Sequence, residues 1–446
     1  MNVRGRVELG TTGEVPSIER GLERTRPPGR RITVVTDIPP RLDYARGFSA
    51  DRSNPSGFSP RLYHLVSALA ERSPVELVAI HADRRDVGRG FVDPALPLQS
   101  YRDVFVGQVP TGRPGLAGRV HAWRQFLFGV LPAWCHPRRV PALEAHVGAS
   151  PPALVVLYLA PLAHLALRLP SNVPVVCVLE EGWERLQEQE LGQRAMGRVR
   201  RGWITASERH RAARLYRRAG ARSTAVVAIS EAEAERFSRW MPRERIVVLP
   251  HGIDCVYFRP GPAAVDDIDV GVFGNLFASR NAGPTLEAWR AAQAAGDEER
   301  SWRWGFVGRA ADELVSAVAP TGALVAGLVP DVRPFYAGCK VVLVPATSGT
   351  GVKTTLLQAW AMQRPVVATS FAATGLPVAP GDNVLIADSP VEMVRQVRRL
   401  LDSAELRRRL AGRGRETVTR FRDIRPIADR FADLCVEAGG TGLAGR

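Results

Sequence analysis

Short runs of apolar residues recur along the first half of the chain, each bounded by polar or turn-forming residues. They are residues 31–40, 75–80, 153–159, 173–179, 223–230 and 245–250. Apolar runs of this length without alternation are typical of strands buried on both faces of a parallel sheet. Helical patterns follow several of them, for example at residues 62–69 and 231–240. The order strand, loop, helix, strand predicts a doubly wound α/β domain.

A second series of the same kind begins after an acidic linker with proline and glycine, residues 260–269. Its predicted strands are residues 269–274, 302–308, 322–329, 340–346 and 364–370, with helices at 284–294 and 354–361 among them. Amphipathic helices are predicted at the end of the chain, over 391–401, 404–420 and 427–438. Two such sheets place a cleft between the carboxyl ends of their strands, where ligands bind in open α/β sheets.

These patterns also predict the domain boundaries. Residues 1–30 are rich in Arg, Glu, Gly and Pro and almost without aromatics, so we expect a disordered leader there. We expect one Rossmann-like domain over 31–260 and a second over 261–421. Residues 422–446 are expected to form a helix and tail, the helix crossing back to brace the first domain.

Length and composition agree with two globular domains. The 446 residues are too many for one ordinary core, and 45% are hydrophobic and 24% charged. The five cysteines are far apart and never form a C-x-x-C pair, which argues against a disulfide framework or a zinc site. The start of the chain lacks the apolar stretch of a secretory signal, and the longest apolar run, 153–169, is interrupted by polar residues. We therefore expect a cytoplasmic protein.

The net charge of +15 comes almost entirely from arginine, because Lys340 and Lys353 are the only lysines. So uneven a ratio indicates a GC-rich coding bias, and a solvated arginine surface is the simplest interpretation. Attraction to an anionic lipid or substrate is the alternative, and residues 198–222 are the richest basic stretch. Its apolar residues, among them Trp203 and Leu215, are too few to predict an amphipathic stripe. Nucleic-acid binding is not expected, because no recognisable module accompanies the charge.

The most informative segment for chemistry is PATSGTGVKTTLLQAWAMQRPVVAT, residues 345–369. A strand, a glycine-containing loop and a helix follow one another, so Gly349, Gly351 and the helix start can offer backbone N–H groups to an anion. Lys353 stands at the positive end of the helix dipole, where a cation is unfavourable. A phosphate bound there would explain the lysine, whereas the alternative is an exposed side chain without a function.

This segment resembles the G-x-G-x-K-x-K-x-x-E-A-x-A-x-G-x-P-V-V motif of the retaining, nucleotide-sugar-dependent glycosyltransferases of family 4. Further stretches are similar to the family pattern, at residues 227–237, 247–260, 272–289, 327–345 and 374–393. The likeness covers residues 226–421 well and the first domain only by pattern. It implies the GT-B fold, in which two Rossmann-like doubly wound parallel-sheet domains face each other across a cleft. It also implies sugar transfer with retention and without a metal or other cofactor.

The resemblance assigns roles residue by residue. Arg280 and Lys353 would bind the donor diphosphate and stabilise the charge that develops on it as it leaves. Gly274 and Asn275 would form a close backbone turn, and Val329 would face the base through its main chain. The loop before the helix would complete the donor site, with Ser348, Gly349, Thr350 and Gly351.

Two departures from the family pattern concern the donor sugar. The two glutamates of the family's E-x7-E pair fall on Thr350 and Gln358. The second glutamate usually holds the ribose hydroxyls, and Gln358 can still hydrogen-bond them without charge. The first contacts the sugar, so its replacement by Thr350 leaves the identity of that sugar open.

In the first domain, Gly57 resembles the family glycine near the phosphates. Glu180 and Glu181 follow a predicted strand at the cleft, and either could orient an acceptor or take its proton; a solvated loop carboxylate is the alternative. His251 is expected to make a structural hydrogen bond. The D-x-D within residues 266–269 resembles the metal motif of the other large glycosyltransferase fold, but we expect a solvated acidic linker there.

The preferred function is transfer of a sugar from a nucleotide sugar to a small polar acceptor, with actinobacterial specialised metabolism, such as antibiotic biosynthesis, as the setting. A cell-envelope glycan or lipid acceptor is the main alternative. With such an acceptor, peripheral contact with the membrane would be expected. Two further alternative functions are a GT-B epimerase or hydrolase and a non-catalytic nucleotide-sugar-binding protein. The oligomeric state is not predicted.

Overall fold

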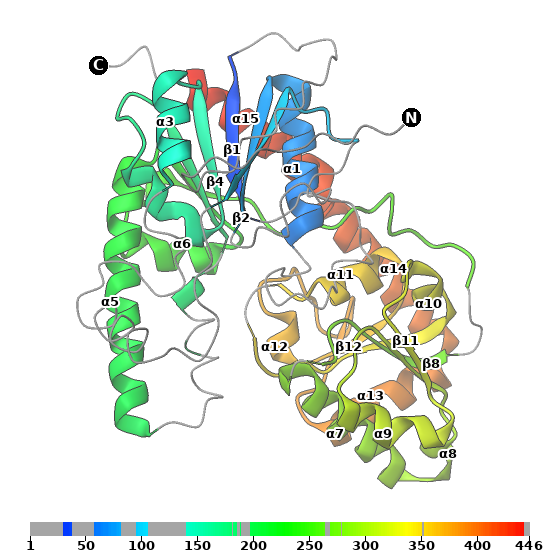
Figure 1. Ribbon diagram of the computed structural model, residues 1–446. Coiled ribbons are helices and arrows are strands. Elements are labelled where there is room, and N and C mark those ends of the chain that lie inside the picture. The colour runs from blue at the N-terminus through cyan, green and yellow to red at the C-terminus, as the bar shows by residue number, and fades with distance from the viewer. Residues whose placement is uncertain are drawn as a thin grey trace, which may run out of the picture.

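The computed structural model describes residues 30–37, 58–81, 95–105, 140–180, 182–184, 188, 197–263, 268–277, 279–349 and 352–440. Within them the chain forms two parallel sheets, each covered by helices on both faces (Figure 1). The leader expected over residues 1–30 lies, apart from Arg30, outside the described residues.

The first sheet has seven described strands in the order β3-β2-β1-β4-β5-β6-β7. These are β1 (Ile32–Thr36), β2 (Val75–His81), β3 (Ser100–Phe105), β4 (Leu154–Tyr158), β5 (Val175–Glu180), β6 (Ala225–Ala228) and β7 (Ile246–Val248). The helices around it are α1 (Phe58–Arg72), α3 (Pro141–Ala149), α5 (Arg198–Arg222) and α6 (Glu231–Ser238), with a 3-10 helix over Ala160–Leu167. The sequence pattern did not predict β3 or α3.

The second sheet has six described strands in the order β10-β9-β8-β11-β12-β13. These are β8 (Ile268–Phe273), β9 (Trp304–Val307), β10 (Leu324–Gly327), β11 (Cys339–Val344), β12 (Val366–Ala368) and β13 (Leu385–Ile386). Its helices are α7 (Ser279–Ala295), α8 (Asp297–Arg300), α9 (Asp312–Val318), α10 (Arg333–Gly338), α11 (Thr354–Ala361), α12 (Ser370–Ala373), α13 (Pro390–Asp402) and α14 (Ala404–Phe421).

Helix α7 starts five residues before the predicted start at Pro284, which lies inside it. Proline cannot donate to the carbonyl four residues earlier, that of Arg280. Only this one bond is given up, in the second turn of a helix of 17 residues. The helix therefore tolerates the proline.

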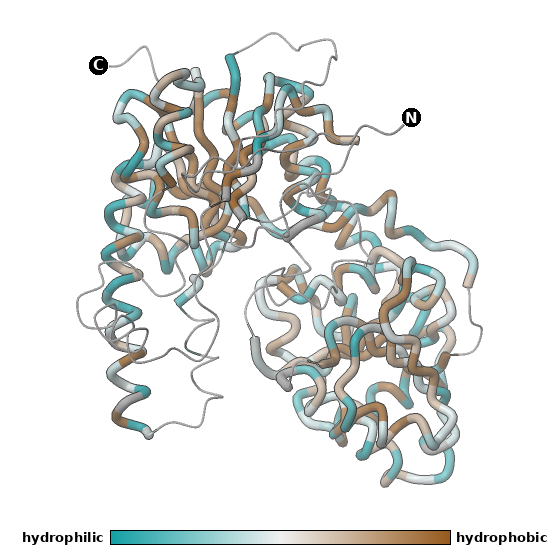
Figure 2. The backbone as a smooth tube through the Cα atoms, viewed as in Figure 1, coloured by the Kyte–Doolittle hydropathy of each residue, from teal (hydrophilic) through white to brown (hydrophobic). Residues whose placement is uncertain are grey.

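Apolar strands account for both cores, because every strand pairs in parallel and is covered on both faces. Strands β1, β4 and β5 are buried at each position. Figure 2 shows hydrophobic residues concentrated in the strands and polar residues on the outer helices. The predicted fold class, two doubly wound parallel-sheet domains, is confirmed.

The last helix, α15 (Ile424–Gly440), returns to the first sheet and packs against α1 (Figure 1). Its apolar side, including Phe431, is buried in the same core as β1 and β4. Arg72 of α1 forms ion pairs with Asp429 (2.8 Å) and Asp433 (3.0 Å) of α15. Two segments thus link the sheets, and they are hydrogen-bonded to each other where Ile253 meets Arg422 and Ile424.

The strand order reverses between β1 and β4 in the first sheet and between β8 and β11 in the second. At such a point the loops after the two central strands diverge to opposite faces and leave a crevice at the carboxyl edge. This topology positions the candidate site. No helix in the described part of the chain is long and apolar enough to span a bilayer.

Candidate functional site

A pocket of about 190 Å³ lies at the switch point of the second sheet. It is formed by the ends of β8 and β11 and the first turns of α7 and α11, with lining residues 272–276, 281, 285, 343–346, 352–355 and 358. Gly274, Asn275, Lys353 and Gln358 were predicted as site residues, and all four line it. The fold thus brings together two segments almost 80 residues apart.

The wall of this pocket at β8 depends on two glycines. Gly274 (φ 114°) and Gly308 (φ 127°) both have left-handed backbone angles that other residues rarely adopt. A Cβ on Gly308 would lie 2.0 Å from the carbonyl oxygen of Gly274. The loops after β8 and β9 therefore touch backbone to backbone. Asn275 then shapes the turn, accepting at its Oδ1 from the amide of Phe277 (3.2 Å) and at its carbonyl from Asn281 (2.8 Å).

The opposite wall is the N-terminal end of α11. The first turn of this helix contains no acidic residue, and Lys353 is its N-cap. The unpaired amides of a first turn and the helix dipole both favour an anion. The Lys353 ammonium lies 5.1 Å from the centre of the Phe371 ring on α12. Positive charge is thus concentrated where β11 ends, as binding of a diphosphate would require.

Gln358 is held by a residue that the sequence did not point to. The hydroxyl of Tyr336, on α10, donates to Oε1 of Gln358 (3.0 Å). Tyr336 is fully buried and stacks on Phe273, with ring centres 3.7 Å apart. Burial raises the pKa of Tyr336 well above its usual value, so the hydroxyl keeps its proton. The amide group of Gln358 is therefore oriented with its N–H donors away from Tyr336.

A second, smaller pocket lies where the two sheets' domains meet. Its residues are Pro60, Arg61 and His64 of α1, residues 251–254 of the connection, Thr354 and Gln358 of α11, and Ile424. Thr354 and Gln358 line both pockets, so the two adjoin. Figure 1 shows one end of α1 next to α11. The junction between the domains therefore opens beside the switch-point pocket.

Two histidines border the interdomain pocket. Burial lowers the pKa of His64, although Asp254, 3.5 Å away, acts in the opposite direction. Nδ1 of His251 lies 3.1 Å from the carbonyl oxygen of Gly252. This contact is the structural hydrogen bond expected for His251.

Glu180 does not have the exposed position that an acceptor-binding carboxylate would need. Its side chain is fully buried and accepts from Nε of Arg61 (2.8 Å). Arg61 also donates to the carbonyls of Pro250 (2.8 Å) and Leu249 (3.0 Å). A register shift in β5 and a φ of 63° at Glu180 turn the side chain inward. Glu180 thus anchors α1 and the connection to the sheet.

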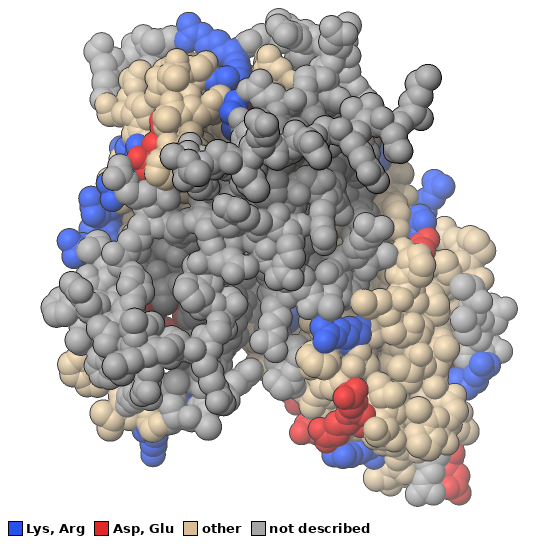
Figure 3. All heavy atoms as spheres, viewed as in Figure 1, with Lys and Arg blue, Asp and Glu red and all other residues tan. Residues whose placement is uncertain are grey.

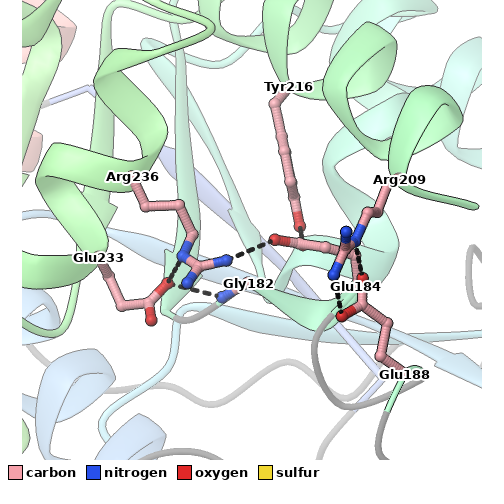
Figure 4. Close-up of polar contacts among 7 residues, drawn as sticks. All are labelled: Gly182, Glu184, Glu188, Arg209, Tyr216, Glu233 and Arg236. Carbon is pink, nitrogen blue, oxygen red and sulfur yellow. Dashed lines mark hydrogen bonds and ion pairs between the residues drawn. The ribbon is translucent and has the colours of Figure 1, made fainter. Parts of the chain in front are cut away.

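The segment that follows β5 is held by carboxylates (Figure 4). Glu233 of α6 accepts from the amide of Gly182 (3.0 Å). Glu184 accepts from the hydroxyl of Tyr216 on α5 (2.9 Å) and forms an ion pair with Arg236 (3.4 Å). These bonds hold α5 and α6 against the carboxyl edge of the first sheet.

The remaining predicted site residues fall in three groups. Val329, Ser348 and Gly349 are described but are not among the residues that line either pocket; Gly349 has a φ of 117° in the loop before α11. The backbone of Arg280 lies in the first turn of α7, and its side chain is outside the described structure. Outside it as well are Gly57, Glu181, Thr350 and Gly351.

The acidic linker offers no metal site within the described residues. Asp269 bonds to Lys340 (2.8 Å) and to the amide of Arg303 (2.8 Å), while Asp266 and Asp267 are not described. Across the described part of the chain, no group of three His, Cys, Asp or Glu could hold a metal ion.

Both halves of the chain match models of known domain families. Residues 56–252 match the model described as "Glycosyl transferase 4-like domain", and residues 267–403 match "Glycosyl transferases group 1". The boundary between these matches coincides with the connection between the two sheets. The chain is a glycosyltransferase.

Solved structures agree with this glycosyltransferase in fold. Sucrose-phosphate synthase from Thermosynechococcus elongatus has a TM-score of 0.63 at 17% identity, over 91% of this chain and 98% of that one. HepE from Anabaena in complex with UDP has a TM-score of 0.60 at 14% identity, over 91% and 99%. Its complex with UDP-glucose gives 0.58 and 16%, over 91% and 99%. The fold is GT-B. No curated protein sequence matches the chain.

Proposed function

We propose that this glycosyltransferase moves a sugar from a nucleoside diphosphate to a small polar acceptor, with retention at the anomeric carbon. The observation that carries the proposal is the pocket at the switch point, where Lys353 and the start of α11 face the glycine turn at Gly274. This arrangement suits a diphosphate. HepE, which shares the fold, binds UDP and UDP-glucose, so UDP-sugars are the donors to test first.

In this proposal the phosphates lie between α11 and α7. Lys353 and Arg280 stabilise the charge that builds on the leaving diphosphate, which is where transition-state binding accelerates the reaction. In this proposal two cationic side chains supply what a divalent ion supplies elsewhere, so we propose turnover without a metal. The leaving phosphate takes the acceptor proton on the face that it departs from, which gives retention.

The acceptor is proposed to enter from the interdomain pocket. That pocket adjoins the donor pocket at Thr354 and Gln358 and is bounded by His64 on the side of the first domain. Glu181 remains the proposed acceptor-orienting carboxylate, because Glu180 is occupied by Arg61. Since Thr350 and Gln358 replace two family glutamates, we propose a donor sugar that differs from the family's common ones.

A cell-envelope glycan or lipid is the second candidate acceptor. The observation that favours it is the exposed basic helix α5 of the first domain. Product analysis with lipid and water-soluble acceptors separates the two candidates.

The deciding experiment compares the only two lysines of the chain. Lys353→Ala should lower kcat/KM by about a hundredfold or more, since it removes a cation from the leaving diphosphate. Lys340→Ala is the matched control, because Lys340 is paired with Asp269 at the start of β11. It should leave turnover and UDP affinity unchanged. Normal turnover of the Lys353 variant would refute the donor-site assignment.

Reactions without acceptor test the alternative functions of hydrolase, epimerase and non-catalytic binding protein. Free sugar or an isomerised donor would indicate a hydrolase or an epimerase. Nucleotide binding without turnover across a broad acceptor panel would indicate a binding protein. Turnover that persists in EDTA is expected, and loss of turnover in EDTA would overturn the metal-independent part of the proposal.

A further inference from the structure

Helix α5 carries an exposed face that transfer of a sugar to a small polar acceptor does not use. Its inward side is buried against the first core at Ala212, Leu215, Tyr216 and Ala219. The opposite side is a continuous row at helical spacing, here termed the outward stripe: Val199, Trp203, Ala206, His210, Arg214 and Arg217, all exposed. The sequence placed Trp203 and Leu215 together as apolar residues, whereas the structure separates them onto opposite faces.

The first half of the stripe is apolar and unusually exposed. Val199 is 79% and Trp203 70% exposed, and they are among the most exposed large apolar side chains of the described residues. They are four residues apart, so they are neighbours on the helix surface. Burial of a large apolar side chain is favourable, so covering this pair would stabilise the complex with a partner.

The second half of the stripe and its flanks are basic. Helix α5 contains nine arginines and one glutamate. Arg198, Arg214, Arg217 and Arg218 are exposed. The ion pairs of α5 with described residues are those of Arg209 with Glu188 and of Arg211 with Glu208. The single glutamate, Glu208, is on the buried side and is paired with Arg211 (3.0 Å). Figure 3 shows Lys and Arg side chains along the edge of the first domain where α5 runs.

The start of α5 also carries positive charge at the end where the helix dipole disfavours it. Its first turn contains arginine and no acidic residue, and the N-cap Gly197 provides no side-chain cap. Positive charge at this end of a helix is unfavourable unless an anion lies nearby. Helix stability alone therefore does not account for these arginines.

Helix α5 is fastened to the first domain along its second half. Tyr216 bonds to Glu184, and Nη2 of Arg209 bonds to Glu188 (2.8 Å) (Figure 4). Figure 1 shows α5 along the outer edge of the first domain and extending past the sheet. The stripe thus points away from the core.

We propose that the outward stripe docks the protein on an anionic membrane surface. Arginines are attracted to anionic headgroups, and tryptophan is favoured at the boundary between water and lipid. A nucleic acid fits less well, because the apolar and basic parts are separate and do not interleave for stacking. A second copy of the chain fits less well, because it would bring arginine-rich faces together.

The test is co-sedimentation of the full chain with phosphatidylcholine vesicles, with and without phosphatidylglycerol. Binding is expected only with the anionic lipid, and salt should weaken it. Trp203→Ala and the double variant Arg214→Gln/Arg217→Gln should each lower the partition coefficient about tenfold. Inorganic phosphate at matched ionic strength should not release the protein, since it offers no apolar phase.

Matched controls come from the second domain. Val391→Ala removes an apolar side chain that is 76% exposed, and Arg399→Gln/Arg408→Gln removes two exposed charges. Both should sediment like the parent chain. The proposal is overturned if the parent does not bind anionic vesicles, or if the controls weaken binding as much as the stripe variants. A Trp203-dependent dimer, or tighter binding to single-stranded RNA than to vesicles, would also overturn it. Vesicle binding needs no donor sugar, so the result is independent of sugar transfer.

Discussion

At the scale of single residues, Gln358 stands where the family motif has a glutamate, and its side chain has a defined orientation. An amide has a donor end and an acceptor end, and the buried hydroxyl of Tyr336 occupies the acceptor end at 3.0 Å. The donor end is then available to the two adjoining pockets. The sequence predicted Gln358 from the family motif, but nothing local indicated Tyr336, which precedes it by 22 residues on a short helix.

Tyr336→Phe should weaken the binding of UDP about fivefold. Loss of one buried hydrogen bond costs about 1 kcal/mol, and Gln358 would lose its fixed orientation. Isothermal titration calorimetry measures the change. Tyr216→Phe is the control, because it removes a similar buried bond, to Glu184 (2.9 Å), in the other domain. Equal UDP affinity of the Tyr336 variant and the parent would show that Tyr336 does not position Gln358 for the nucleotide.

At the scale of elements, the donor-site helix α11 is placed by its contact with α14. Trp360 of α11 is fully buried and donates to the carbonyl of Asn383 (2.9 Å). Gly414 of α14 lies directly against it, and a Cβ there would be 2.3 Å from Trp360 Cδ1. The close approach of two helices therefore depends on one missing side chain.

Gly414→Ala should destabilise the second domain by about 1–3 kcal/mol, since a rigid buried ring must move. Because α11 carries Lys353 and Gln358 into the pocket, UDP affinity should fall as well. Gly412→Ala in the same helix meets nothing within 4 Å and should be neutral or stabilising by up to about 1 kcal/mol. Urea unfolding with and without UDP measures both effects, and similar behaviour of the two variants would contradict the packing account.

At the scale of the whole molecule, the C-terminal helix belongs physically to the first core. Phe431 of α15 is 1% exposed and packs with the buried faces of β1, β4 and α1. The chain therefore crosses between the domains at residues 249–253 and again at 422–424, and the two crossings are hydrogen-bonded. A Cβ on Gly252 would lie 2.9 Å from the Cα of Ile424, so the crossings touch.

Phe431→Ala should destabilise the first domain by about 3–5 kcal/mol, although it is a change near the C-terminus. Limited proteolysis with mass spectrometry should show cleavage beginning within residues 58–250 while residues 268–420 stay intact. Val436→Ala on the same helix removes a side chain that is 42% exposed and should change stability by less than about 0.5 kcal/mol. First cleavage in the second domain would contradict the assignment of α15.

The sequence by itself determined the features that repeat locally. Strands buried on both faces consist of runs of apolar residues, so most strands of both sheets were predicted close to their bounds. Helix α11 was predicted at its observed bounds as well. A ligand cleft at the carboxyl ends of the strands was also predicted, because ligands bind there in open α/β sheets. Gly274, Asn275 and Gln358 were predicted from the family resemblance, and Lys353 also from its position at a helix start. All four line the pocket, and their roles stay predictions.

Only the tertiary structure decided which distant side chains meet. Glu180 looked like a cleft carboxylate, but a strand irregularity and Arg61, 119 residues away, bury it. Tyr336 of α10 reaches Gln358 of α11, and the packing of α5 on the first core buries Leu215 while it leaves Trp203 exposed. Periodicity reports which face of an element is apolar. It does not report which element covers that face, because this depends on the packing of the whole chain.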